Sequence, residues 1–106
     1  MALQINTSLT TQDGGLVPSG SLVKIETNFP MEGMTYNTSM KIWRNESAYI
    51  NGLASFKPQQ IPNLNFNTEL TLEEYTGITP TVVQNKAKAY LEQYLGGGTV
   101  TINWNF

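Results

Sequence analysis

Residues Thr79–Phe106, which read TPTVVQNKAKAYLEQYLGGGTVTINWNF, carry the clearest local structure signals in the chain. Thr79 is of the type that caps helix N-termini, and Pro80 suits the first helical position, where no backbone N–H is needed. Apolar residues then recur at three- and four-residue spacing, at Val83, Ala87, Tyr90, Leu91, Tyr94 and Leu95. The pattern predicts a helix over about 80–95 whose apolar stripe packs on a sheet.

Three glycines, at 96–98, follow this helix and predict its end. The residues after them alternate between polar and apolar side chains, which predicts a terminal strand over about 99–106. Its inward-facing residues would be Val100, Ile102, Trp104 and Phe106. Two alternatives remain open for this strand. It pairs within its own sheet, or the glycines act as a hinge and the strand adds to the sheet of a neighbouring molecule.

The rest of the chain repeats the strand pattern three times. Apolar and polar residues alternate over 21–29, 34–44 and 63–70, as expected for antiparallel strands with one buried face. Leu3 and Ile5 indicate a further short strand, and Thr71–Gly77 has the composition of one capped helical turn. The segment Glu46–Ile50 fits either a short helix or a strand. Residues 57–62, with two prolines, are expected to form an exposed, mobile loop.

These elements predict one α+β domain over residues 1–106. Its main part would be an antiparallel sheet, or a small β-sandwich, of about five to seven strands. The C-terminal helix at about 80–95 and the terminal strand at about 99–106 would complete it.

Composition removes many kinds of chemistry. The chain has no Cys and no His, so thiolate nucleophiles, disulfides and histidine-based catalysis or metal binding are excluded. The net charge of −2 and the six basic residues argue against nucleic-acid binding. We find no signal peptide and no membrane-spanning run, so we expect synthesis in a cytoplasm and no membrane partner.

We therefore expect no catalytic residue, no metal and no cofactor. The eight carboxylates form no short motif, and a hydrolase remains an alternative only if two of them meet in a cleft.

Aromatic side chains are the remaining candidates for a contact surface. Trp43 falls on the polar side of its strand, where it either covers a sheet edge or loop or serves as an exposed anchor in a protein contact. A sugar-stacking platform is a further alternative, with Tyr36, Trp43, Tyr49, Tyr75 and Trp104 as candidates. As candidate interface residues we take Trp43, Tyr49, Val100, Ile102, Trp104 and Phe106.

Three stretches resemble small structural proteins of tailed bacteriophages, particularly phages of Bacteroidota hosts. They are INTSLTTQDG at 5–14, VPSGSLV at 17–23 and LEEYTGITPTVV at 72–83. The resemblance covers both ends of the chain and is poor in the middle. It implies a non-enzymatic virion component of the tail, neck or baseplate, present as a symmetric ring or in repeated copies. Its partners would be other virion proteins and itself. The alternative is a carbohydrate- or receptor-binding module of a virion or cell-surface fibre, with a glycan as partner.

Overall fold

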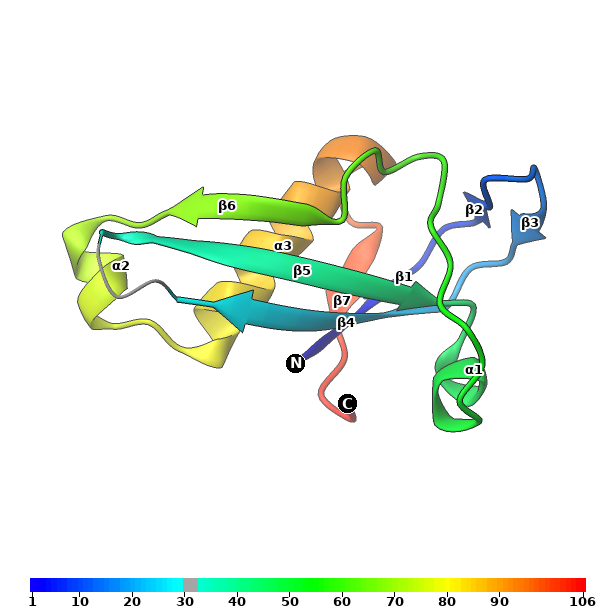
Figure 1. Cartoon of the computed structure of the whole chain (residues 1–106), viewed down its shortest axis with the longest axis horizontal. Helices are drawn as coiled ribbons and strands as arrows, with labels where there is room; N and C mark the ends of the chain where they lie inside the picture. The colour runs from blue at the N-terminus through cyan, green and yellow to red at the C-terminus, as the bar shows by residue number, and fades with distance from the viewer. Residues whose placement is uncertain (30–32) are drawn as a thin grey trace.

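The computed structural model describes residues 1–29 and 33–106, and its centre is a five-stranded antiparallel sheet (Figure 1). The strand order is β6-β5-β4-β1-β7. The strands are β1 (Ala2–Ile5), β4 (Ser21–Asn28), β5 (Thr35–Trp43), β6 (Asn65–Glu69) and β7 (Val100–Ile102). A separate two-stranded sheet, β2 (Leu9–Thr10) with β3 (Leu16–Val17), lies between β1 and β4 in the chain.

The register of the strands separates apolar from polar side chains. Leu3 of β1 pairs with Val23 of β4, which pairs with Ile42 of β5, and all three are fully buried. Because side chains alternate between faces along a strand, these residues share one face. We call it the covered face. The opposite face carries the intervening residues, among them Lys24 and Lys41, and we call it the open face.

The three helices begin where the capping residues predict. In α1 (Glu46–Ile50), the Asn45 side chain accepts a hydrogen bond from the backbone N–H of Ala48. Thr71 caps α2 (Leu72–Thr76), and Thr79 caps α3 (Pro80–Leu95), with Pro80 at its start. α3 has 16 residues, so it rises about 24 Å along its axis.

α3 packs on the covered face, and Figure 1 shows it running obliquely from below the end of β4 to above the start of β6. Val83, Ala87 and Leu91 join the sheet residues in one apolar cluster. Tyr90 stacks on Phe66 of β6, with ring centroids 4.0 Å apart. The buried stripe also includes Gln84, which the sequence pattern did not place there, and its amide donates to the backbone oxygen of Ala2.

The structure confirms the α+β class, the antiparallel sheet, the helix at 80–95 and the C-terminal strand. That strand ends at Ile102, and Asn103 beyond it is buried. The expectation that Trp104 faces inward is wrong, because its side chain is 72% exposed. A turn follows Ile102 and ends the strand pairing there, although polar and apolar residues continue to alternate in the sequence up to residue 106.

Two further segments of the chain can now be placed. Glu46–Ile50 is a helix, one of the two structures that its sequence allowed. The expectation of an exposed loop at 57–62 is wrong for Pro58 and Ile61, which are buried. The side chains of Gln59 and Gln60 hydrogen-bond to Thr11 and Thr10, respectively, and Phe56 bridges to Ile42. Contacts with β2 and β5 therefore hold a segment that has no regular structure of its own.

The last strand pairs within its own sheet. Leu3, Gln4 and Ile5 of β1 face Ile102, Thr101 and Val100 of β7. The glycine turn before the strand is held on both sides, because Glu92 accepts from the N–H of Gly98 at 2.6 Å and Thr99 donates to the oxygen of Gly96 at 2.6 Å. Gly96 and Gly98 have φ of 98° and 79°, which favours glycine at both positions. This arrangement corresponds to the first of the two alternatives for the strand.

Candidate functional site

Three of the candidate interface residues form one aromatic cluster on the open face, beside α1. The Tyr49 ring meets Trp43 edge-on at 4.9 Å and Phe106 edge-on at 5.7 Å between centroids. The Trp43 indole N–H donates to the backbone oxygen of Leu53 at 2.8 Å. Trp43 ends β5, Tyr49 lies in α1, and Phe106 follows β7, so the fold brings together residues that are far apart in sequence.

A hollow of about 450 Å³ lies beside this aromatic cluster on the open face. Trp43 and Tyr49 form part of its lining, and the segment that contains Lys57, Asn63 and Asn65 forms another part. The strands β4 and β5 contribute Lys24, Glu26, Ser39 and Lys41. We call this site the lysine hollow, because three of the chain's six Lys and Arg residues line it: Lys24, Lys41 and Lys57.

Two of these lysines are direct cross-strand partners. Lys24 of β4 lies opposite Lys41 of β5, and like charges in directly opposite positions destabilise a sheet. The Lys24 ammonium donates to the backbone oxygen of Phe106 at 2.8 Å and lies 5.4 Å from the centre of the Tyr49 ring. A hydrogen bond and a cation–π contact therefore hold Lys24 against the aromatic cluster.

No side-chain carboxylate in the described residues forms an ion pair with these three lysines. Glu26 lines the hollow, but the one ion pair among residues 1–29 and 33–106 joins Lys86 to Glu74, away from the hollow. The hollow thus holds three ammonium groups and one carboxylate, in a chain whose net charge is −2. The hollow is therefore locally positive, whereas the net charge of the whole chain is negative.

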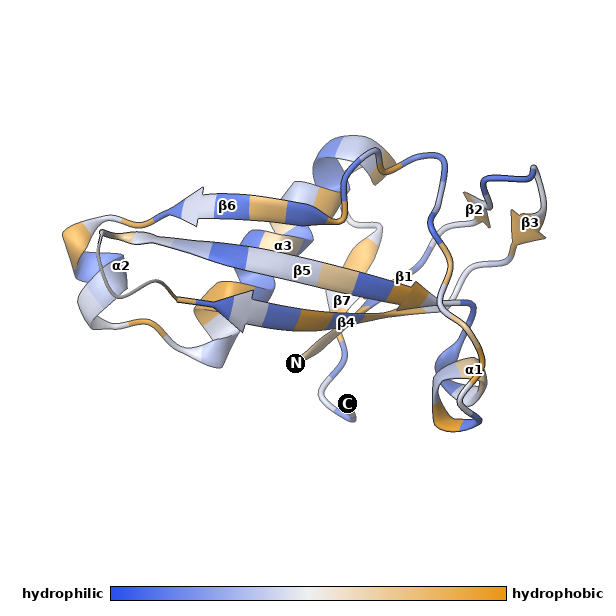
Figure 2. Cartoon of the chain, viewed as in Figure 1, coloured by the Kyte–Doolittle hydropathy of each residue, from blue (hydrophilic) through white to orange (hydrophobic). Residues whose placement is uncertain are grey.

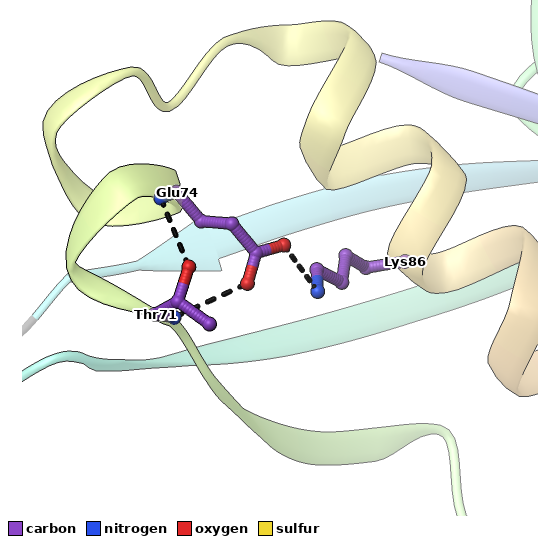
Figure 3. Close-up of polar contacts among 3 residues, drawn as sticks. All are labelled: Thr71, Glu74 and Lys86. Atoms are coloured by element: carbon purple, nitrogen blue, oxygen red, sulfur yellow. Dashed lines mark hydrogen bonds and ion pairs between the residues drawn. The ribbon is translucent and has the colours of Figure 1, made fainter.

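Glu74, the second residue of the acidic pair Glu73-Glu74, has a structural role (Figure 3). Thr71 and Glu74 form a reciprocal capping box at the start of α2, and Glu74 also pairs with Lys86 of α3 at 2.6 Å. The hydrogen bond from Lys86 is the main reason that the pKa of Glu74 lies below its ordinary value. These contacts fasten α2 to α3.

The remaining candidate interface residues do not join the aromatic cluster. Val100 is buried between the sheet and α3, and Ile102 is partly buried beside it. Trp104 is the most exposed large apolar residue in the described part of the chain. In those same residues, no group of three or more acidic side chains is placed to hold a metal ion. None of the helices described has both the length and the apolar character needed to cross a membrane.

The sequence matches no protein-family model, and neither the curated proteins nor the solved structures include a significant match.

Sequence reasoning missed the lysine hollow, although part of its signal was present. Lys24 and Lys41 both fall on the polar side of predicted strands, so a shared face could have been inferred. Their direct opposition depends on the pairing register, with Asn28 facing Asn37 at the near end of the hairpin. Lys57 carried no such signal, because it belongs to the irregular segment.

Proposed function

We propose that this protein is a non-enzymatic structural subunit that assembles with copies of itself, as part of a tailed-phage virion. The observation that carries this proposal is the position of the exposed large apolar side chains. The molecule measures 42 × 25 × 23 Å, and most of these side chains belong to elements at the two ends of its long axis (Figure 2).

One end is formed by α2 and the adjoining termini of β4 and β5. Leu72 and Tyr75 belong to α2, Phe29 directly follows β4, and Met34 directly precedes β5. All four side chains are more than two-fifths exposed, and Leu72 is 68% exposed. We call this the α2 end. Scattered single apolar residues on a surface are ordinary, whereas several on adjoining elements are typical of a contact surface.

The opposite end is formed by α1 and the β2–β3 sheet. Ile50 is the last residue of α1, Leu53 follows it closely, and Leu16 belongs to β3. All three are more than half exposed. We call this the α1 end.

The two ends are built from different residues and different elements. Contact between an α2 end and an α1 end is therefore heterologous, and repetition of such a contact produces a closed ring or an open filament. Rings and repeated copies are the arrangements implied by the resemblance to phage structural proteins. The virion location rests on that resemblance, and mass spectrometry of purified particles of the encoding phage tests it directly.

The assembly is tested by blocking one end at a time. We expect the wild-type chain to form species larger than a dimer in sedimentation velocity at high concentration. Leu72→Asp at the α2 end and Leu53→Asp at the α1 end should each give monomers, because each places a charge in an apolar contact. A mixture of the two variants should give dimers and nothing larger, since each retains the end that the other lacks.

Tyr94→Ser is the matched control, because Tyr94 is an exposed apolar residue of α3 outside both ends. It should assemble like the wild type. A wild-type chain that stays monomeric at millimolar concentration would contradict the self-assembly. Variants that each remain dimeric alone would contradict the heterologous contact in favour of a symmetric one.

A further inference from the structure

The lysine hollow combines features that stability alone does not explain. Lys24 and Lys41 occupy directly opposite positions of the ladder, where like charges are unfavourable, and Lys57 adds a third positive charge to the same lining. No side-chain carboxylate within residues 1–29 and 33–106 forms an ion pair with any of them, although the Lys24 ammonium is engaged by an oxygen of Phe106 and by the Tyr49 ring. An anionic ligand would relieve this repulsion, because it would supply the missing opposite charge.

The rest of the lining indicates what kind of anion fits. Trp43 and Tyr49 supply flat apolar surface, and hydrogen bonds hold Trp43 and Lys24 in place beside it. Ser39, Asn63 and Asn65 contribute hydroxyl and amide groups, which match the alternating donors and acceptors of a polyhydroxylated ring. The volume of about 450 Å³ falls in the range of small-molecule sites, about 300–1,000 Å³.

Other anions fit less well. A nucleic-acid backbone would meet a molecule of net charge −2, with only a small positive area. An extended acidic peptide would pair along a sheet edge, whereas the hollow lies on the face of β4 and β5, which are both flanked by strands on either side. Inorganic phosphate would leave the aromatic surface unused.

We propose that the lysine hollow binds an anionic saccharide, a sugar that carries a carboxylate or a sulfate group. Lys24, Lys41 and Lys57 neutralise the acidic group, the aromatic side chains contact the apolar face of the ring, and the polar side chains contact its hydroxyls. The hollow adjoins the α1 end, since Trp43 donates to the backbone oxygen of Leu53, but none of the exposed apolar residues assigned to the two ends lines it. Sugar binding can therefore be tested on the chain whether or not it self-assembles.

The test is a calorimetric titration of the full chain with defined probes. They are trigalacturonate as the carboxylated sugar, a sulfated galactose trisaccharide, neutral galactotriose, inorganic phosphate and a hexaglutamate peptide. We expect at least one of the two anionic sugars to bind, and the better of the two identifies the acidic group. Backbone amide shifts in NMR spectra should then be largest at Lys24, Lys41, Tyr49, Lys57 and Asn63.

Lys41→Gln should weaken binding of the better sugar about tenfold, since it removes one charge-assisted contact. Lys88→Gln is the matched control, because Lys88 lies in α3 and does not line the hollow. It should leave the affinity unchanged, and circular dichroism should show both variants folded. Absence of binding by both anionic sugars would overturn the proposal. Equal binding of galactotriose, phosphate or hexaglutamate would overturn it too, as would an equal loss in Lys88→Gln.

Discussion

The two faces of the central sheet are made by alternate residues of the same strands, yet they differ in what fixes their side chains. On the covered face, Leu3, Val23 and Ile42 form one row, and they belong to the same apolar cluster as the buried residues of α3. On the open face, the corresponding row contains Lys24 opposite Lys41, with polar neighbours. Substitutions on the covered face are poorly tolerated, because removing a buried methyl group leaves a cavity. The second face accommodates two like charges in opposite positions, with the Lys24 ammonium held by the Phe106 oxygen and the Tyr49 ring.

The open face also has an ordered polar part. Asn37 lies opposite both Asn28 and Asn67, and its side-chain amide donates to Asn65 and Asn67. These uncharged amides satisfy one another without a covering layer. Lys24 is held instead by the Phe106 oxygen and the Tyr49 ring, so different contacts order the two parts of the open face.

The largest change in stability should follow truncation of a leucine that is buried on the covered face. Leu91 of α3 is fully buried against the covered face, and Leu91→Ala should lower the free energy of unfolding by about 3 kcal/mol. Leu72→Ala is the matched change at an exposed site, and its effect should stay below about 0.5 kcal/mol. Urea denaturation followed by circular dichroism measures both. Similar losses in the two variants would contradict the burial pattern.

A threonine on each face gives a second comparison, with effects of opposite sign. The Thr38 hydroxyl is buried on the covered face and has no hydrogen-bond partner in the described part of the chain. Thr38→Val should therefore raise the free energy of unfolding by about 1 kcal/mol. Thr101 on the open face accepts a hydrogen bond from Asn6 at 3.1 Å, so Thr101→Val should lower it by about 0.5 kcal/mol. A stability loss in Thr38→Val would mean that the hydroxyl is satisfied, for example by a buried water.

Reversing one charge of the lysine pair should stabilise the fold by a smaller amount. Lys41→Glu places opposite charges across β4 and β5, and we expect a gain of a few tenths of a kcal/mol that shrinks as salt is added. Thermal melts at low and high salt measure it. Lys88→Glu serves as the control. Lys88 lies in α3 and has no lysine opposite it, so this change should give no gain in stability. No gain at Lys41 would show that the two ammonium groups avoid each other in solution.

The smallest effect concerns the lysine that does have a carboxylate partner. The bond with Lys86 lowers the pKa of Glu74 below 4.5, so the folded state favours the charged carboxylate. The resulting stabilisation is present above that pH and is lost as the pH falls through the lowered pKa. We expect Glu74→Gln to be slightly less stable than the wild type at neutral pH and equal to it in acid. A difference between the two proteins that is independent of pH would contradict this assignment.

Much of the fold could be predicted because periodicity and capping are local signals. Thr79, Pro80 and the glycine triplet define α3, and the alternation around Val23 and Met40 defines the hairpin of β4 and β5. Trp104 was misplaced because alternation does not reveal where a partner strand ends. The segment at 57–62 was misjudged because prolines indicate irregular backbone, whereas burial of Ile61 depends on contacts with distant residues.

The candidate site was less predictable, since it depends on which residues meet in space. Trp43, Tyr49 and Phe106 were chosen as single aromatic residues, and their common cluster follows from the positions of α1 and the C-terminal segment. To predict that Lys24 lies opposite Lys41, the register between β4 and β5 must be known, and the sequence of either strand alone does not determine it. Sequence patterns therefore predicted the covered face better than the open face.

The position of β1 between β4 and β7 has a consequence for how the protein is made. One edge of β1 finds its partner only in residues 100–102, and the neighbouring contact between Asn6 and Thr101 spans 95 positions. During translation this edge stays unpaired until the last strand has left the ribosome, and unpaired edges promote aggregation. Closing so long a loop also slows folding, because the entropy of the intervening chain is lost before the contact forms. We therefore expect nascent chains that lack the last strand to be the species that most needs chaperones.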